Sequence, residues 1–206
     1  MSRIKDIYVL FTIILAAIFW YLTFAAQIIN FWLSMTIAAS TLSILAIYWG
    51  GFPFSKSDIN LRSIIIGISS AIILYFVFWA GNILSQIIFD FARPQIISIY
   101  DIRTQGQAIL INLILLFITS PGEEIFWRNF LQKWSMNRFG DFGGWVLASL
   151  IYAGVHISSR NFMLVMAALV AGLFWGFIYW RENNVVPVII SHQIWTIGIF
   201  VIFPVM

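Results

Sequence analysis

Long apolar runs are the feature that most restricts how this chain can fold. Seven segments approach the roughly 20 mainly apolar residues that a transmembrane helix needs. They cover residues 7–26, 29–49, 63–83, 108–119, 144–157, 162–180 and 186–206. Only 9% of the 206 residues are charged, whereas soluble domains carry about 25%. We therefore expect an all-α, polytopic integral membrane helical bundle with about seven transmembrane helices.

The basic residues predict an orientation for these spans. The first apolar run lacks the short core and small-residue cleavage site of a signal peptide, so we expect a retained span. With the N-terminus in the cytoplasm, seven of the eleven basic residues fall on the cytoplasmic side. These seven are Arg3, Lys5, Lys56, Arg62, Lys133, Arg138 and Arg181, against Arg93, Arg103 and Arg160 outside. The eleventh, Arg128, is left out of the count as a candidate site residue. This bias favours a cytoplasmic N-terminus.

The chain is expected to form a single membrane domain over residues 1–206. Residues 1–106 would hold three accessory spans and a loop, and residues 107–206 would hold the catalytic core. The sizeable loops are 50–62 and 86–106, where the apolar piece 87–91 could lie at the membrane interface. The chain has no cysteine, which excludes disulfides, thiolate metal sites and a cysteine nucleophile. Its basic residues are scattered at segment ends, so no nucleic-acid partner is expected.

Two acidic residues and an arginine stand together inside this apolar chain. Each charge in hydrocarbon costs roughly 2.5–3.5 kcal/mol on insertion scales, so such a group usually has a function. One interpretation is structural: Ser120, Pro121 and Glu123 match a capping box at a helix start. Glu124 and Arg128 are then an i,i+4 ion pair. Both interpretations can hold together, with Glu123 facing the interior as a general base.

His156 is the first of two histidines in apolar segments, and Tyr152 lies one helical turn before it. Glu123 and His156 are about equally far from the turn signal at 137–144. A helical hairpin would therefore bring them to a similar level. This requires a long fourth helix, broken near Pro121, that extends past the bilayer on the cytoplasmic side.

His192 is the second histidine and lies in the last apolar segment, between Ser191 and Gln193, with Thr196 one turn later. These polar side chains could simply form hydrogen bonds across helices, as they do in membrane bundles. In the functional interpretation, His192 is a second imidazole that closes a pocket, and Thr196 lies on the same helix face.

A glutamate and two histidines allow three kinds of chemistry. In the first, the carboxylate activates a water and the imidazoles polarise a carbonyl group. The second is the same hydrolysis with zinc, because two histidines and a glutamate form a known catalytic ligand set; a His-Glu-x-x-His pair is absent, however. The third is a proton or ion relay in a carrier, which the modest size and the lack of repeats disfavour. A serine hydrolase is poorly supported because there is no Gly-x-Ser-x-Gly elbow.

Three segments resemble the ordered motifs of the CPBP intramembrane proteases. They are Glu123-Glu124-Ile-Phe-Trp-Arg128, Tyr152-Ala-Gly-Val-His156 and His192-Gln-Ile-Trp-Thr196. The family includes the CAAX prenyl endopeptidases and bacterial proteins linked to bacteriocin processing or self-immunity. The resemblance covers residues 121–196. Tyr152 stands where the family usually has Phe, and Thr196 stands where it commonly has Asn or Asp.

The resemblance implies an intramembrane endopeptidase that uses glutamate-activated water. Glu123 would be the base, His156 and His192 would complete the catalytic site, and supporting roles would fall to Glu124, Arg128, Tyr152 and Thr196. A zinc ion, if one is bound, would be held by Glu123, His156 and His192. The implied partners are membrane lipids and a peptide or membrane-protein substrate, with or without a lipid group, in a bacterial plasma membrane. The alternative is an inactive member that binds a peptide or confers bacteriocin immunity.

Overall fold

A computed structural model of the chain describes residues 4–205, and its regular secondary structure consists of helices. It is 87% helical, and no strand occurs among the described residues. Six helices in this part of the chain are long and apolar enough to cross a membrane, and a shorter apolar helix, Val186–Ile202, follows them. The predicted all-α membrane bundle of about seven helices is confirmed. The cytoplasmic orientation of the N-terminus stays a prediction. Arg3 and Met206 lie outside the described residues.

Several of the long helices contain π-helical or 3-10 turns. Helix α1 (Asp6–Trp20) continues through a π-helical turn, Tyr21–Ala26. Helices α2 (Phe31–Gly50), α3 (Leu61–Ile88) and α4 (Ala92–Asp101) follow. One long helix comprises α5 (Ala108–Ile114), a π-helical stretch (Leu115–Thr119), α6 (Ser120–Glu124), a second π-helical stretch (Ile125–Gln132) and α7 (Lys133–Phe139). Next are α8 (Asp141–Val155), a 3-10 turn (His156–Ser159), α9 (Phe162–Glu182), α10 (Val186–Thr196) and a final π-helical turn (Ile197–Ile202).

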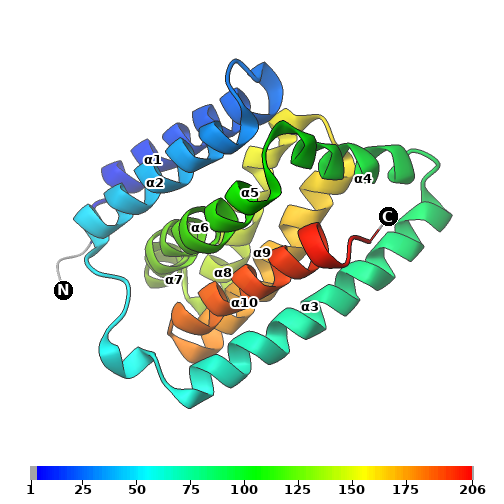
Figure 1. Cartoon of the computed structure of the whole chain (residues 1–206). Coiled ribbons are helices and arrows are strands. Elements are labelled where there is room, and N and C mark those ends of the chain that lie inside the picture. Colours follow the sequence, from blue (N-terminus) through cyan, green and yellow to red (C-terminus); the bar gives the residue numbers. More distant parts are fainter. Residues whose placement is uncertain (1–3, 206) are drawn as a thin grey trace.

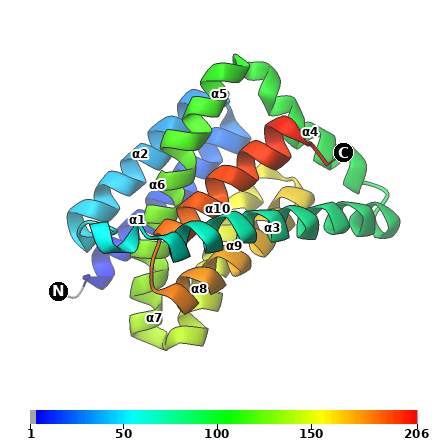
Figure 2. The ribbon, with the colours of Figure 1, turned by 60° about the horizontal axis from the view of Figure 1, so that its bottom comes forward.

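The long helix α5–α7 lies between two pairs of helices. Helices α1 and α2 run side by side on one side of it, and α10 lies along α3 on the other (Figure 1). Helix α8 packs against both α7 and α9. The turn between α7 and α8 projects beyond the neighbouring helix ends (Figure 2). Residues of α1 and α2 join Phe126, Trp127 and Phe130 in one core cluster, so the first two spans pack directly on the long helix.

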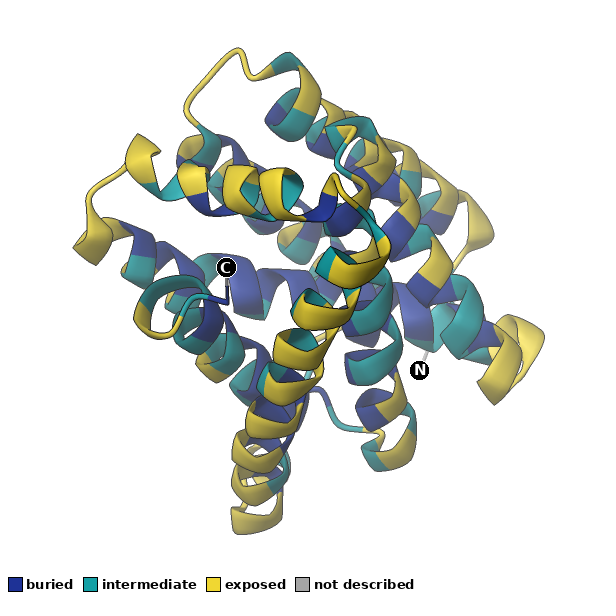
Figure 3. Ribbon diagram, turned by 90° about the vertical axis from the view of Figure 1, so that its right-hand side faces the viewer, coloured by how far each residue is buried: buried dark blue, intermediate teal, exposed yellow. Residues whose placement is uncertain are grey.

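Exposed apolar side chains cover the outside of this bundle. Figure 3 shows exposed residues along the outward faces of the helices and buried ones on the inward faces. Ile7, Ile44 and Phe76 are each at least 60% exposed, although a soluble protein would bury most such residues. Ser70, Ser149 and Ser191 are instead buried. Apolar residues outside and small polar residues between helices are typical of proteins in a lipid environment.

The long helix is not broken near Pro121, and the prediction of a capping box there is wrong. Thr119 and Ser120 have helical backbone angles, and neither side chain caps a helix start. Proline lacks an N–H and clashes with the carbonyl one turn earlier. The π-helical stretch Leu115–Thr119 ends two residues before Pro121, and its wider turn lets the helix continue.

Residues 86–106 were predicted to form a loop, but most of them are helical. Helix α3 continues to Ile88, and most of the remainder forms α4 and a 3-10 turn, Ile102–Gln105. Ile87 and Phe91, in the piece expected at the interface, are exposed. The predicted turn at 137–144 is present: α7 ends at Phe139 and α8 begins at Asp141. Gly140 between them has φ +78°, which glycine adopts without strain.

Candidate active site

The two adjacent glutamates lie near the middle of the long helix. Glu123 and Glu124 close helix α6, with one π-helical stretch before it and another after it. Both are buried, at 9% and 0% exposure. Because π-helical turns change the direction in which side chains project, they occur often at functional sites. The sequence therefore places two carboxylates inside the bundle, where each needs a partner.

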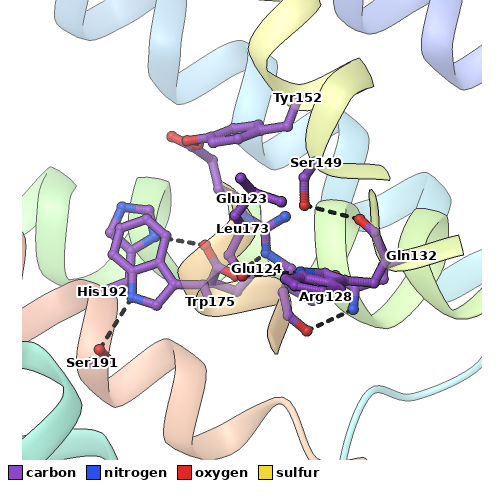
Figure 4. A network of polar contacts seen from close by, with 12 residues as sticks. Glu123, Glu124, Arg128, Gln132, Ser149, Tyr152, Leu173, Trp175, Ser191 and His192 are labelled. Atoms are coloured by element: carbon purple, nitrogen blue, oxygen red, sulfur yellow. Dashed lines mark hydrogen bonds and ion pairs between the residues drawn. The ribbon is translucent and has the colours of Figure 1, made fainter. Parts of the chain in front are cut away.

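Both carboxylate oxygens of Glu124 are bonded. Its Oε2 accepts a hydrogen bond from Arg128 Nε at 3.0 Å, which is the predicted i,i+4 ion pair. Its Oε1 lies 2.8 Å from His192 Nδ1, which comes from α10. All three side chains are buried, and Figure 4 shows them converging from two helices. Glu124 therefore links the glutamate helix to the last apolar helix.

Glu123 is bonded on one side only. Its Oε2 accepts a hydrogen bond from the Tyr152 hydroxyl at 3.0 Å, and Figure 4 shows the side chains of Glu123 and Tyr152 meeting at their oxygen ends. Its Oε1 has no hydrogen-bond partner among the described residues. The Arg128 guanidinium carbon lies 5.0 Å from the centre of the Tyr152 ring. This is within the range of a cation–π contact, so Tyr152 contacts both charged groups.

His192 is held between a carboxylate and an aromatic face. Its ring is stacked on Trp175 with 4.0 Å between centroids and 24° between planes. The Trp175 indole N–H donates to Ser191 Oγ at 3.1 Å, which fixes the indole against α10. With Nδ1 directed at Glu124, the Nε2 atom of His192 is free of hydrogen bonds among the described residues. A carboxylate that orients an imidazole in this way also occurs in hydrolase triads.

His156 has a different environment. It begins the 3-10 turn after α8, and its Nε2 accepts a hydrogen bond from the Trp20 indole at 3.0 Å. Since Nε2 accepts, Nδ1 carries the proton and donates to the backbone oxygen of Tyr152 at 2.8 Å. The imidazole is thus a neutral tautomer with both nitrogens bonded.

The hairpin of α7 and α8 does bring the second motif beside Glu123. The group in contact with Glu123 is the Tyr152 hydroxyl, one turn before His156. The His156 ring lies beside Tyr152, with 5.0 Å between ring centroids. Thr196 is buried one turn after His192, and its Oγ1 has no hydrogen-bond partner. The structure therefore groups the third motif and Tyr152 around the glutamates, and directs His156 towards α1.

Two tryptophans at this site were not predicted from the sequence. Trp20, from the first span, bonds His156, and Trp175, from α9, stacks on His192. The chain has ten tryptophans, and nothing in their spacing distinguishes these two.

The side chains that could hold zinc do not form a ligand set in this arrangement. No group of three or more His, Cys, Asp or Glu side chains within residues 4–205 is placed to hold a metal ion. Both nitrogens of His156 are engaged by Trp20 and the backbone, and Nδ1 of His192 is engaged by Glu124. The predicted donors thus do not fit a zinc site in this arrangement.

Comparison with known protein families gives a match in the C-terminal part of the chain. Residues 105–198 match the family model described as type II CAAX prenyl endopeptidase Rce1-like. This part of the chain is therefore similar to the Rce1-like family. The family predicted from the three motifs is thereby confirmed, and the Rce1-like region contains all seven predicted site residues. No curated protein and no solved structure shows a significant match to the chain.

The match supports a protease of the CAAX type in general. The family is one of CAAX-type proteases, and the apolar helices make this a multi-pass membrane protein. The first three spans lie outside the matched residues, although α1 contributes Trp20 to the environment of His156.

Proposed function

We propose that this chain is an intramembrane endopeptidase that hydrolyses a peptide bond with a water molecule activated by Glu123. The observation that carries the proposal is the difference between the two glutamates. Glu124 has both oxygens bonded, to Arg128 and to His192. Glu123 keeps one oxygen free, so it is the carboxylate that can take a proton from water.

The proposed reaction uses the free atoms of the site. The water oxygen attacks the carbonyl carbon of the substrate while its proton passes to Glu123. The developing charge on the carbonyl oxygen is stabilised by the Nε2–H of His192, which acts in this proposal as an imidazolium with its Nδ1–H bonded to Glu124. The C–N bond then breaks, and Glu123 returns its proton to the leaving amine. Thr196, with its free hydroxyl one turn from His192, is a second donor for that oxygen.

Supporting roles follow from the remaining contacts. Tyr152 holds one oxygen of Glu123 and so fixes the direction of the other. Arg128 holds Glu124 and lies over the Tyr152 ring. The catalytic role that the resemblance implies for His156 stays a prediction. In the present arrangement we propose that His156 acts through Tyr152, because its Nδ1–H is bonded to the backbone of that residue.

An apolar cavity supports a lipidated peptide as the substrate. The cavity has a volume of about 480 Å³ and lies between α3, α4, α9 and the end of α10. Trp195 lines it and also contacts His192, with 6.4 Å between ring centroids. The cavity therefore begins one side chain away from the proposed oxyanion donor. The family description names prenyl endopeptidases, and we propose that a prenyl or similar chain occupies this space in a bacterial plasma membrane.

The test is cleavage by the purified protein in liposomes. Two peptides of identical sequence, with and without a farnesyl thioether, serve as substrates. Glu123→Gln is expected to lower cleavage at least a hundredfold, because a general base typically contributes 10²–10⁴-fold. Glu182→Gln is the matched control, since Glu182 bonds Arg62 at the far end of α9. It should cleave at the wild-type rate.

The results also address the alternative function. Full cleavage by Glu123→Gln would refute the proposed base. If neither peptide is cleaved, the uncut precursor is sought by comparing membrane peptides of cells with wild-type protein and with Glu123→Gln. If those membranes do not differ and Glu123→Gln still protects cells against a bacteriocin, the chain is an immunity or peptide-binding protein.

A further inference from the structure

A side chain that directly follows His192 makes an unusual contact with the glutamate helix. The Gln193 amide donates a hydrogen bond from Nε2 to the backbone oxygen of Leu116, at 2.5 Å. Backbone carbonyls inside a helix normally accept from their own helix and need no side chain from another element. The contact therefore marks a carbonyl that lacks its usual partner.

The missing partner is explained by Pro121. In a π-helical stretch each carbonyl accepts from the N–H five residues later, and Leu115–Thr119 is such a stretch. The residue five positions after Leu116 is Pro121, which has no N–H. The Leu116 oxygen is thus left free by the sequence itself. An unpaired carbonyl is costly in an apolar environment, and Gln193 supplies the donor.

Two consecutive residues of α10 therefore attach to the same helix at two places. His192 bonds Glu124 and Gln193 bonds Leu116. The two acceptors are eight residues apart, or about two helical turns. One attachment alone would let α10 rotate or slide about the contact. Two attachments fix both its rotation and its height relative to the glutamates.

We propose that Gln193 is a positioning residue of the active site: its bond to the carbonyl left free by Pro121 sets His192 against the glutamate pair. Pro121 and Gln193 then act together: the proline leaves the Leu116 carbonyl without a donor in its own helix, and the Gln193 amide donates to it. The proposal rests on the proposed hydrolytic function for its effect on cleavage. The contact itself does not depend on that function.

A double-mutant cycle between the two positions tests the proposal. Gln193→Met keeps the length of the side chain and removes the donor. It is expected to lower kcat on the order of tenfold, as the loss of one part-buried hydrogen bond at the site does, with KM unchanged. Pro121→Ala restores an N–H that can bond Leu116. In that background Gln193→Met should lower kcat no more than about twofold.

The same cycle is read in the melting temperature, which needs no enzyme activity. Gln193→Met should lower the Tm in detergent by several degrees, and by much less in the Pro121→Ala background. Gln86→Met is the matched control, because Gln86 donates within its own helix, to Asn82. Gln86→Met should leave kcat unchanged, and its effect on the Tm should be the same with and without Pro121→Ala.

The outcomes separate this inference from the proposed function. Equal effects of Gln193→Met on the Tm in both backgrounds would overturn the role of Gln193, whether or not the protein cleaves peptides. Coupling in the Tm together with a kcat that Gln193→Met leaves unchanged would also overturn it, because the contact would then be structural only. If no peptide is cleaved but the Tm shows coupling, the proposed function fails while the Pro121–Gln193 contact stands.

Discussion

The two histidines of this chain are held in opposite ways. His192 is bonded to a carboxylate that also pairs with Arg128, so its surroundings are ionic. His156 is bonded to an indole N–H and a backbone carbonyl, so its surroundings are neutral. The sequence motifs imply the same role, completing the catalytic site, for both histidines. An ionic environment such as that of His192 can stabilise a charge that appears during the reaction. The neutral environment of His156 instead holds the imidazole in one tautomer.

The contrast also separates the contributions of the helices. The ionic side is built from α6, the π-helical stretch Ile125–Gln132 and α10, all inside the Rce1-like region. The neutral side depends on Trp20 of α1, which lies outside the matched residues. The predicted division into accessory spans and a catalytic core stays a prediction, but the Trp20–His156 contact joins the two parts.

The largest expected effect on the free energy of unfolding follows from removing the Arg128 cation, which pairs with Glu124 on the ionic side of the site. Arg128→Met keeps most of the apolar stem and removes the cation, which leaves Glu124 buried with His192 as its one partner. Removing one partner of a buried ion pair typically costs about 3–5 kcal/mol. We expect a loss of this size in the free energy of unfolding, measured by denaturation in detergent micelles.

The control for this change is Arg138→Met, on the same long helix. Arg138 lies 3.9 Å from Asp6, and both side chains are exposed. Such exposed pairs contribute less than about 1 kcal/mol. Similar losses for the two variants would mean that the Glu124–Arg128 pair is solvated in the membrane protein, and the contrast between ionic and neutral sides would not hold.

The ionic pair was predictable from the sequence, whereas its surroundings were not. Glu124 and Arg128 are four residues apart on one helix, so local spacing was sufficient to predict their contact. The membrane bundle was predictable for the same kind of reason, because long apolar runs fix the spans. These features depend on residues that are close together in the sequence.

The features that sequence analysis missed depend on distant residues. The wide turn before Pro121 is completed by Gln193, 77 residues from Leu116. Trp20 and His156 are 136 residues apart, and an indole in an apolar run gives no sign of its partner. Proline after serine signals a helix start in most proteins, so the capping box was the natural but wrong expectation.

A smaller effect is expected for the bond between His192 and Glu124. A cycle of His192→Leu, Glu124→Gln and the double variant isolates the pair from the cost of unpaired groups. Hydrogen bonds to a charged group contribute about 1.5–3 kcal/mol, and we expect a coupling in this range from unfolding in detergent. A coupling near zero would show that Arg128 alone determines the state of Glu124, and the ionic description of His192 would be wrong.

The smallest effect is expected on the neutral side, from Trp20→Phe. This change removes the indole N–H and keeps an aromatic ring against Trp127, which Trp20 contacts edge to face with 5.6 Å between centroids. The bond from Trp20 to His156 joins neutral groups, so its loss should cost about 1 kcal/mol in the free energy of unfolding. Nitrogen NMR of labelled histidine should also show His156 Nε2 losing its donor.

The matched control is Trp134→Phe, because the Trp134 indole donates to the exposed carboxylate of Asp6. Water can replace that bond, so Trp134→Phe should change stability by less than Trp20→Phe does. A loss for Trp20→Phe as large as the His192–Glu124 coupling would place both histidines in equally strong environments. In that case His156 would have to be treated as a second charged centre, and the division of the site into an ionic and a neutral side would be abandoned.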